Sequence, residues 1–268
     1  MQDCSGGYMK ITVDIGNTTI AFGFFDDGEL RRVLTIDTDS RRTFDQYLVQ
    51  VTNLLEREAL LNIVVDEAII ASVVPIETKK MFQLILTLFK IEALIVGPGI
   101  KTGLALKVDN PNEVGADLVA VSVGALSFYE APFIIVDLGT VNKFILIDEN
   151  KQFVGVSFTP GMMMSKDALD QKTALLMQVS LEKPNKVIGK NTKDALNSGL
   201  IYGTIAQIKG MVSLISREAN TKLPVILTGG NAVFISGELV DDQNSEYIYN
   251  SFLVHFGLNE ILTKNKRK

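Results

Sequence analysis

Two short segments of the chain each place an aspartate and a glycine directly after an apolar run. Asp14 and Gly16 follow the first run, and Asp137 and Gly139 follow the second. A carboxylate can hold a cation, and glycine lets the backbone come close to a bound group. A bend of this kind can therefore bind a phosphate together with its metal ion, because the cation offsets the repulsion between two anions.

The match between the two segments indicates an internal duplication. We call residues 14–19 the first bend and residues 137–140 the second bend; they lie about half of the 268-residue chain apart. Hydroxyl and amide side chains follow the glycine in both, as phosphate ligands would. Each Asp-x-Gly could instead be only a hairpin turn, but the presence of two matched copies favours two bends that face each other across a cleft and hold a polyphosphate.

The composition is that of an enzyme with an ordinary buried core. Hydrophobic residues make up 47% of the chain, and the net charge of −5 argues against nucleic acid or a membrane surface as the main partner. The single cysteine, Cys4, rules out a disulfide framework and fits a reducing cytoplasm. No apolar run is long enough to span a bilayer. We expect a cytoplasmic protein that acts on a small molecule.

The hydrophobic periodicity predicts an α/β fold that is built twice. The first half is expected to hold three strands followed by alternating helices and strands, and the second half repeats the strands and ends in a helix. The predicted strands are 11–13, 21–25, 32–36, 67–72 and 93–96, a set of strands within 133–146, and strands 153–158 and 225–228. The predicted helices are 42–61, 76–89, 116–128, 165–177, 192–220 and 247–262.

The duplication also sets the predicted domain limits. An N-terminal extension covers residues 1–9, an N-terminal domain covers residues 10–115, and a C-terminal domain covers residues 116–262. Residues 263–268 form a basic tail that we expect to be solvated, since a charged terminus has nothing to pack against.

This order of elements resembles the acetate and sugar kinase/actin superfamily, whose actin-like (ribonuclease H-like) fold has two similar domains with a cleft between them. Eight motifs narrow the resemblance to type III pantothenate kinase, because they occur in that family's order and spacing over most of the chain. The motifs are Asp14–Thr18, Gly97–Gly103, Asn110–Asp117, Asp137–Thr140, Pro160–Gly161, Ile188–Thr192, Ser198–Gly203 and Thr228–Gly230.

The resemblance implies that the protein phosphorylates the primary hydroxyl of pantothenate with ATP, the first step of coenzyme A biosynthesis. It implies a homodimer that uses Mg²⁺ and a monovalent cation, K⁺ or NH₄⁺. It also implies roles for individual residues. Asp137 would bind the monovalent cation, and Asp14 would reach Mg²⁺ through the phosphates. The ATP site would comprise Asp14, Ile15, Gly16, Asn17, Thr18, Thr19, Ile20, Ala21 and Thr140. The acceptor site would comprise Val108, Gly115, Ala116, Asp117, Leu118 and Thr192.

Asp117 would be the general base in that site. A primary alcohol must lose its proton as it attacks the γ-phosphoryl group. A carboxylate at a helix start can lie close to that hydroxyl while remaining ionised, ready to accept the proton. Taken alone, Asp117 could be only an N-terminal helix cap. The preceding Asn110–Gly115 block favours the catalytic role.

The chain departs from the family pattern at positions that would meet the ligands. Leu118 stands where most members have arginine, and Val108 stands where they have tyrosine. Leucine cannot replace the paired hydrogen bonds of arginine to a carboxylate. Directly after the second bend, Asn142 and Lys143 stand where the family usually has threonines. The Lys143 ammonium could occupy the place of the monovalent ion near Asp137. Alternatively, Lys143 is a solvent-facing strand lysine.

Two other functions therefore stay open. The protein could be a non-catalytic relative that binds nucleotide and serves a regulatory or accessory role, or a related kinase that acts on a neutral alcohol. The chain keeps all three carboxylates, Asp14, Asp117 and Asp137, which favours an active enzyme.

Three further features have modest interpretations. His255, the only histidine, is predicted to be a packing or surface residue. The Thr228–Gly230 segment fits a strand-to-helix turn near the adenosine, or only a turn. Apolar residues within 168–211 are numerous enough for the helical dimer interface that the resemblance implies.

Overall fold

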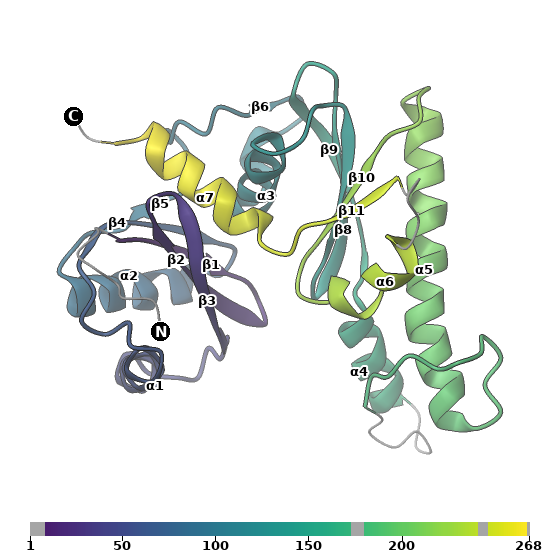
Figure 1. Ribbon diagram of the computed structural model, residues 1–268, viewed down its shortest axis with the longest axis horizontal. Helices are drawn as coiled ribbons and strands as arrows, with labels where there is room; N and C mark the ends of the chain where they lie inside the picture. The colour runs from purple at the N-terminus through teal and green to yellow at the C-terminus, as the bar shows by residue number, and fades with distance from the viewer. Residues whose placement is uncertain (1–8, 173–179, 241–245, 267–268) are drawn as a thin grey trace. The chain divides into compact units, whose positions relative to one another are not determined.

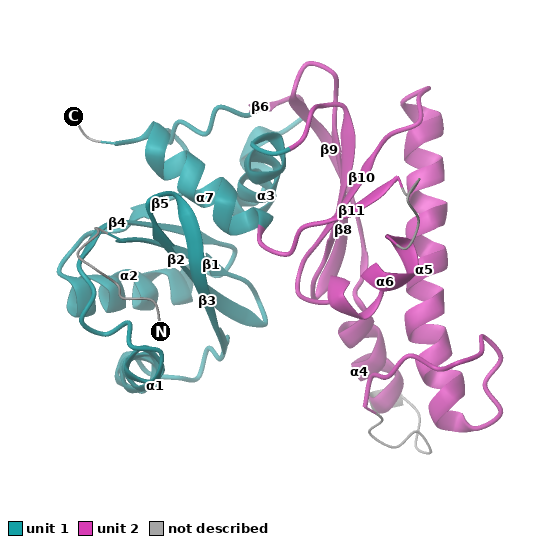
Figure 2. Cartoon of the chain, in the orientation of Figure 1, with its two compact units in different colours: residues 1–104, 109–128, 253–268 teal, residues 105–108, 129–252 magenta. Residues whose placement is uncertain are grey.

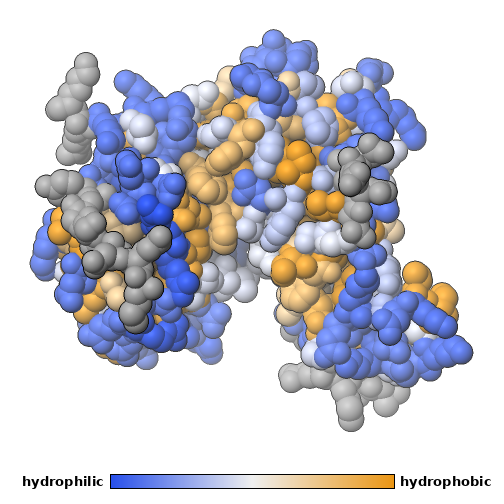
Figure 3. All heavy atoms as spheres, in the orientation of Figure 1, coloured by the Kyte–Doolittle hydropathy of each residue, from blue (hydrophilic) through white to orange (hydrophobic). Residues whose placement is uncertain are grey.

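The chain folds into two compact units, which Figure 2 shows in different colours. The computed structural model describes residues 9–172, 180–240 and 246–266. Unit 1 comprises residues 1–104, 109–128 and 253–268, and unit 2 comprises residues 105–108 and 129–252. Hydrophilic residues take up much of the face shown in Figure 3, as expected for a chain of net charge −5.

Unit 1 is built on a mixed sheet whose strand order is β3-β2-β1-β4-β5. The central strand β1 pairs antiparallel with β2 and parallel with β4, so the first three strands form a meander and the last two follow helical crossovers. The strands are β1 (Met9–Ile15), β2 (Thr19–Asp26), β3 (Glu29–Asp37), β4 (Val65–Ser72) and β5 (Leu94–Ile95).

Helices lie on both faces of this sheet (Figure 1). Ile11, Val13 and Ile15 of β1 share one buried cluster with side chains of α1 (Phe44–Arg57) and α2 (Pro75–Phe89). Thr12, which points to the opposite face because side chains alternate along a strand, contacts His255 of α7. The remaining helices of unit 1 are α3 (Ala116–Leu126), α7 (Leu253–Lys264) and the short 3₁₀ turn η1 (Pro111–Glu113).

Unit 2 is built on a second mixed sheet, with strand order β11-β10-β7-β8-β9-β6. The central strand β7 pairs antiparallel with β8 and parallel with β10, and its buried residues pack against the long helix α5. The elements are β6 (Ala105–Leu106), β7 (Phe133–Leu138), β8 (Val141–Ile147), β9 (Gln152–Pro160), β10 (Val225–Thr228), β11 (Tyr247–Tyr249), α4 (Met162–Lys172), α5 (Thr192–Glu218), η2 (Ala232–Phe234) and α6 (Ser236–Leu239).

The two sheets repeat one topology, which confirms the predicted α/β fold built twice. The order β3-β2-β1-β4-β5 in unit 1 corresponds to β9-β8-β7-β10-β11 in unit 2, and β6 is an addition to the second sheet. Asp14 lies near the end of the central strand β1, and Asp137 lies near the end of the central strand β7. The duplicated sequence therefore places the two carboxylates at equivalent positions.

Most predicted elements are present, but the C-terminal segment differs from the prediction. Residues 247–262 were expected to form one helix, whereas Tyr247–Tyr249 form β11 and the helix α7 begins at Leu253. Tyrosine and isoleucine favour strands, and β11 pairs with β10, a partner that is distant in sequence. The two-residue strand β6 was not predicted, and residues 173–177 of the expected helix 165–177 lie outside the described residues.

The predicted domain limits follow the repeated sequence and stay a prediction. The compact units follow contacts instead, and they count both α3 and α7 with the first sheet. Within residues 9–172, 180–240 and 246–266, no helix combines the length and the apolarity that a bilayer crossing requires.

Helices α3 and α7 cross at two glycines. A Cβ atom added to Gly257 would lie 1.7 Å from the carbonyl oxygen of Ala120, and one added to Gly124 would lie 2.0 Å from the carbonyl oxygen of Leu253. Any larger residue must push the two backbones apart. The close crossing is therefore the reason for glycine at positions where glycine otherwise weakens a helix.

We predict that Gly257→Ala destabilises the protein by about 1–3 kcal/mol, because the added methyl group has no space between two backbones. The control is Gly210→Ala in α5, where nothing lies within 4 Å of the added Cβ atom. This control should be neutral or stabilising by up to about 1 kcal/mol. Urea unfolding measures both changes. Equal effects of the two substitutions would contradict the close crossing.

His255 is buried in unit 1, so of the two predicted alternatives, packing or surface residue, it is a packing residue. Its Nδ1 atom lies 2.8 Å from the Thr12 hydroxyl, and a Cβ atom on Gly23 would meet both side chains within 3.0 Å. Burial lowers the pKa of His255 from 6.5 to about 4, since the charged imidazolium would lose its hydration. The folded state therefore holds a neutral imidazole.

This lowered pKa predicts a pH-dependent stability. Above pH 6.5 the imidazole is neutral in both states, whereas between pH 6.5 and about 4 only the unfolded chain gains its proton, so stability falls as the pH falls. The loss should approach about 3 kcal/mol near pH 4. Urea unfolding of the wild type and of His255→Gln is measured from pH 7 to pH 4.5. The difference between the two pH profiles gives the contribution of His255 to stability, because the chain has one histidine. Parallel pH profiles of the two proteins would contradict the assignment.

Candidate active site

The first bend closes on itself and is tied to the loop after β3. The amide of Gly16 donates to the carbonyl oxygen of Thr19 at 2.9 Å. The amide of Thr38 donates to the carbonyl oxygen of Thr18 at 2.9 Å. The hydroxyl of Thr38 donates to the carbonyl oxygen of Gly16 at 2.8 Å. The side chains of Asn17, Thr18 and Thr19 are exposed, as phosphate ligands must be.

A group of mostly buried polar side chains fixes the loop that holds this bend. The Tyr47 hydroxyl accepts from the Asp39 amide at 2.9 Å, and burial raises the pKa of this phenol. Lys80 donates to the carbonyl oxygen of Arg42 at 2.7 Å and to the carboxylate of Glu77 at 2.9 Å. The sequence analysis missed this support; the polar residues directly after β3 were the available signal for a turn.

Asp117 lies in the first turn of α3. The helix begins after Gly115, which offers no capping side chain, and a Cβ atom at Gly115 would lie 2.5 Å from Oδ1 of Asp117. The carboxylate therefore folds back over Gly115, at the positive end of the helix dipole. Asn110 caps the 3₁₀ turn η1, which precedes α3: its side-chain oxygen accepts a hydrogen bond from the Asn112 amide at 3.2 Å.

The first bend and the start of α3 lie at the same edge of the unit 1 sheet. Strands β1 and β4 are parallel, so Asp14 pairs with Ala71 and both strands end at this edge. The amide of Val73 donates to the carbonyl oxygen of Ile15 at 3.1 Å. The Val73 side chain in turn lies 3.5 Å from the position of a Cβ atom on Gly115. Unit 1 thus brings the ends of two segments that are about 100 residues apart in the sequence to one place.

The second bend is enclosed by two close backbone approaches in unit 2. The amide of Gly161 donates to the carbonyl oxygen of Thr140 at 3.0 Å, and a Cβ atom on Gly161 would lie 2.2 Å from the carbonyl oxygen of Gly139. Asn231 donates through its side-chain amide to the carbonyl oxygen of Gly139 at 2.9 Å. The Thr228–Gly230 segment is therefore a turn that packs on the second bend.

Lys143 lies beside Asp137 in this bend. The two residues are directly opposite each other on β8 and β7, and the Lys143 Nζ atom lies 2.6 Å from Oδ2 of Asp137. Their side chains are 19% and 16% exposed, so the pair is largely shielded from solvent. Lys143 is thus an ion-pair partner of Asp137 rather than a solvent-facing lysine, and an ammonium already occupies one oxygen of the predicted cation ligand.

The two predicted metal sites differ in how well the residues fit them. Magnesium bound to nucleotide usually needs one or two carboxylates beside the phosphates, and Asp14 next to the Gly16 backbone fits that requirement. A K⁺ or NH₄⁺ ion at Asp137 does not fit, because it would share the carboxylate with the Lys143 ammonium. Among the described residues, no group of three or more acidic, histidine or cysteine side chains could hold a metal by itself.

The predicted acceptor residues are distributed over both units. Ala116 and Leu118 belong to α3 with Asp117, and the Leu118 side chain is only 5% exposed. Val108 follows β6 in unit 2 and is half-buried. Thr192 is the exposed first residue of α5, directly after its cap Asn191.

The fold defines the class of protein as actin-like, a class that includes kinases and ATPases. A Sinorhizobium meliloti protein described as a 2-dehydro-3-deoxygalactonokinase is 10% identical, with a TM-score of 0.61 over 97% of both chains. MreB 5 of Spiroplasma citri bound to AMPPNP is 10% identical, with a TM-score of 0.51 over 96% of both chains. At such identities these likenesses show the fold alone.

The family follows from the sequence model and not from these structures. Residues 10–214 match the model of type III pantothenate kinase, and the chain belongs to this family. A Campylobacter jejuni structure, described as a Baf family transcriptional activator, is 19% identical, with a TM-score of 0.57, and the match covers 95% of this chain and 98% of that one. The predicted kinase class with an ATP site is thereby supported.

Adjacent glycines test the packing of the second bend. We predict that Gly229→Ala lowers the free energy of unfolding by about 1–3 kcal/mol, because its φ of +90° disfavours a side chain and the new Cβ atom would lie 2.5 Å from Oδ1 of Asp137. Gly230→Ala is the control, since nothing lies within 4 Å of its added Cβ atom. Its effect should stay within about 0.5 kcal/mol. Urea unfolding measures both, and a neutral Gly229→Ala would contradict the packing.

Proposed function

We propose that the protein transfers the γ-phosphoryl group of ATP to the primary hydroxyl of pantothenate. The observation that carries this proposal is the position of Asp117 at the same edge of the unit 1 sheet as the first bend. A phosphate on the bend and a hydroxyl at Asp117 would then be neighbours. Positioning of this kind supplies much of the catalysis in phosphoryl transfer, which needs no covalent nucleophile from the protein.

The reaction assigns one step to Asp117. The acceptor oxygen forms a bond to the γ-phosphorus, the bond to the ADP oxygen breaks, and the hydroxyl proton passes to the Asp117 carboxylate. The carboxylate that accepts the proton lies in the first turn of α3, at the positive end of the helix dipole.

The first and second bends bind the nucleotide in this proposal. The Gly16 backbone and the exposed side chains of Asn17, Thr18 and Thr19 would donate hydrogen bonds to phosphate oxygens, and Thr140 of the second bend would be a further nucleotide ligand. Asp14 would hold Mg²⁺ together with the phosphates. The ion, when bound, neutralises charge on the transferred group.

A homodimer in the cytoplasm completes the proposal. Ile188 is 80% exposed before α5 and Leu214 is 55% exposed on it, so this region offers apolar surface to a second copy. A stable interface would have to bury more than about 1,000 Å². The exposed Thr192 at the start of α5 would then reach the acceptor, in its own subunit or in the second one.

Leu118 favours one alternative acceptor. Its side chain is nearly fully buried and carries no charge, so it does not present a cation to a carboxylate as arginine would. A kinase that acts on a neutral alcohol is therefore the second candidate. A neutral amide of pantothenate, tested beside pantothenate, distinguishes the two acceptors.

The test is a coupled ADP-release assay with ATP, Mg²⁺ and pantothenate. We expect pantothenate-dependent turnover in the wild type and a loss of about 100-fold or more in Asp117→Asn, because the amide cannot accept the proton. Asp45→Asn is the matched control, since Asp45 is also an acidic residue in the first turn of a helix. It should retain the wild-type rate.

The possible outcomes separate the candidates. Faster turnover of the neutral amide would favour the neutral-alcohol kinase. ATP binding without turnover of either acceptor would favour a non-catalytic relative with a regulatory or accessory role. Equal rates of Asp117→Asn and Asp45→Asn would exclude Asp117 as the base.

A further inference from the structure

We propose that Lys143 is a built-in cation: its ammonium takes the place of the K⁺ or NH₄⁺ ion at Asp137, so that nucleotide binding needs no monovalent cation. The inference rests on the proposed function only insofar as the second bend binds ATP. It does not depend on which acceptor the enzyme uses.

The side chains of Lys143 and Asp137 are in direct contact. Lys143 Nζ and Asp137 Oδ2 are 2.6 Å apart, a short charge-assisted hydrogen bond. Because the residues face each other across the β7–β8 pair, the lysine reaches the carboxylate without leaving its strand. Both side chains are less than one-fifth exposed, so solvent screens the pair only weakly.

The other carboxylate oxygen of Asp137 is also enclosed. A Cβ atom on Gly229 would lie 2.5 Å from Oδ1 of Asp137, so the backbone of the Thr228–Gly230 turn covers that side. The ammonium contacts Oδ2 and the turn lies against Oδ1. An additional cation on this carboxylate would have to displace one of them, and beside Lys143 it would meet a like charge.

The duplicated fold provides an internal comparison. In unit 1 the residue directly opposite Asp14 is Ala21, whereas in unit 2 the residue opposite Asp137 is Lys143. Directly opposite residues share a sheet face, so the first bend has a methyl group where the second has an ammonium. The second carboxylate is therefore paired with an ammonium from the neighbouring strand, and the first has no lysine at the equivalent position.

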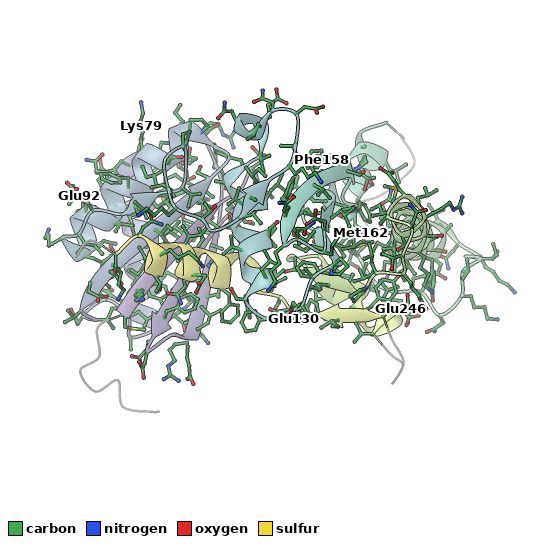
Figure 4. All side chains as sticks on the ribbon, turned by 90° about the horizontal axis from the view of Figure 1, so that it is seen from above. Lys79, Glu92, Glu130, Phe158, Met162 and Glu246 are labelled. Atoms are coloured by element: carbon green, nitrogen blue, oxygen red, sulfur yellow. The ribbon has the colours of Figure 1, made fainter. Side chains whose placement is uncertain are left out.

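The neighbouring strand places an apolar residue opposite the lysine. Phe158 of β9, labelled in Figure 4, lies directly opposite Lys143 and shares its sheet face. Lys143 is thus flanked by a carboxylate on one strand and a phenyl ring on the other. The carbon stem of lysine packs well beside an apolar side chain while its ammonium stays on a polar partner.

The test measures ATP affinity by calorimetry in Mg²⁺ buffers whose monovalent cation is K⁺, NH₄⁺ or N-methyl-D-glucamine at equal ionic strength. The wild-type dissociation constant should vary by less than about twofold among the three salts. Lys143→Met should bind ATP at least about tenfold more weakly in N-methyl-D-glucamine, and K⁺ or NH₄⁺ should restore most of the loss. The methionine leaves space for the ion and a carboxylate to hold it.

Two further variants serve as controls. Lys166 forms a similar pair with Asp170 in unit 2, at 2.8 Å and with side chains 17% and 20% exposed. Lys166→Met removes an equivalent ammonium away from the bend and should leave the cation response unchanged. In Asp137→Asn combined with Lys143→Met, K⁺ should restore nothing, because the ligand for the ion is gone.

The wild type alone can overturn the inference, even if the variants fail to fold. Wild-type ATP binding that falls at least about tenfold without K⁺ would show that the site still needs the ion. A Lys143→Met variant that is indifferent to K⁺ would also contradict it, as would a wild type that binds ATP in none of the salts. Salt-independent ATP binding without turnover of pantothenate would overturn only the proposed function.

Discussion

A carboxylate near the end of the central strand is the constraint on which both units depend. The residues around Asp14 and Asp137 bring backbone and polar groups close to a negative charge. In the proposed function, each bend would have to offset that charge before it could accept phosphate. The two units differ in the residue that lies directly opposite this carboxylate. Unit 1 places alanine opposite its aspartate, and unit 2 places lysine there. A duplicated fold can thus keep its geometry while its copies acquire different electrostatic roles.

Close backbone packing around glycines fixes the geometry of the second bend and of helix α3. Gly161 and Gly229 allow neighbouring turns to touch the second bend, and Gly124 and Gly257 allow α3 to lie against α7. The helix that carries Asp117 is therefore held by a second helix from the far end of the chain. Catalytic groups in phosphoryl transfer act mainly through position, so such contacts support function although they touch no ligand.

The sequence predicted what depends on local pattern and on repetition. Strand 225–228 was predicted with its observed limits, and the two bends were identified because each Asp-x-Gly follows a strand. The proximity of Lys143 to Asp137 could also be predicted from the sequence, since a tight hairpin joins the two strands that carry them. Tyr247–Tyr249 were misassigned because their strand exists only through pairing with distant β10, and the support from Thr38 and Tyr47 arises from tertiary contacts that no local pattern reveals.

The contact between Thr12 and His255 joins the two ends of the polypeptide inside unit 1. Thr12 and His255 are 243 positions apart in the sequence, so the sheet face of β1 that carries Thr12 is covered only when a very distant segment has docked. Unit 2 takes no segment from this helix. Contacts of such long range form slowly because a long loop must first close, and we therefore expect this face of unit 1 to be covered late in folding.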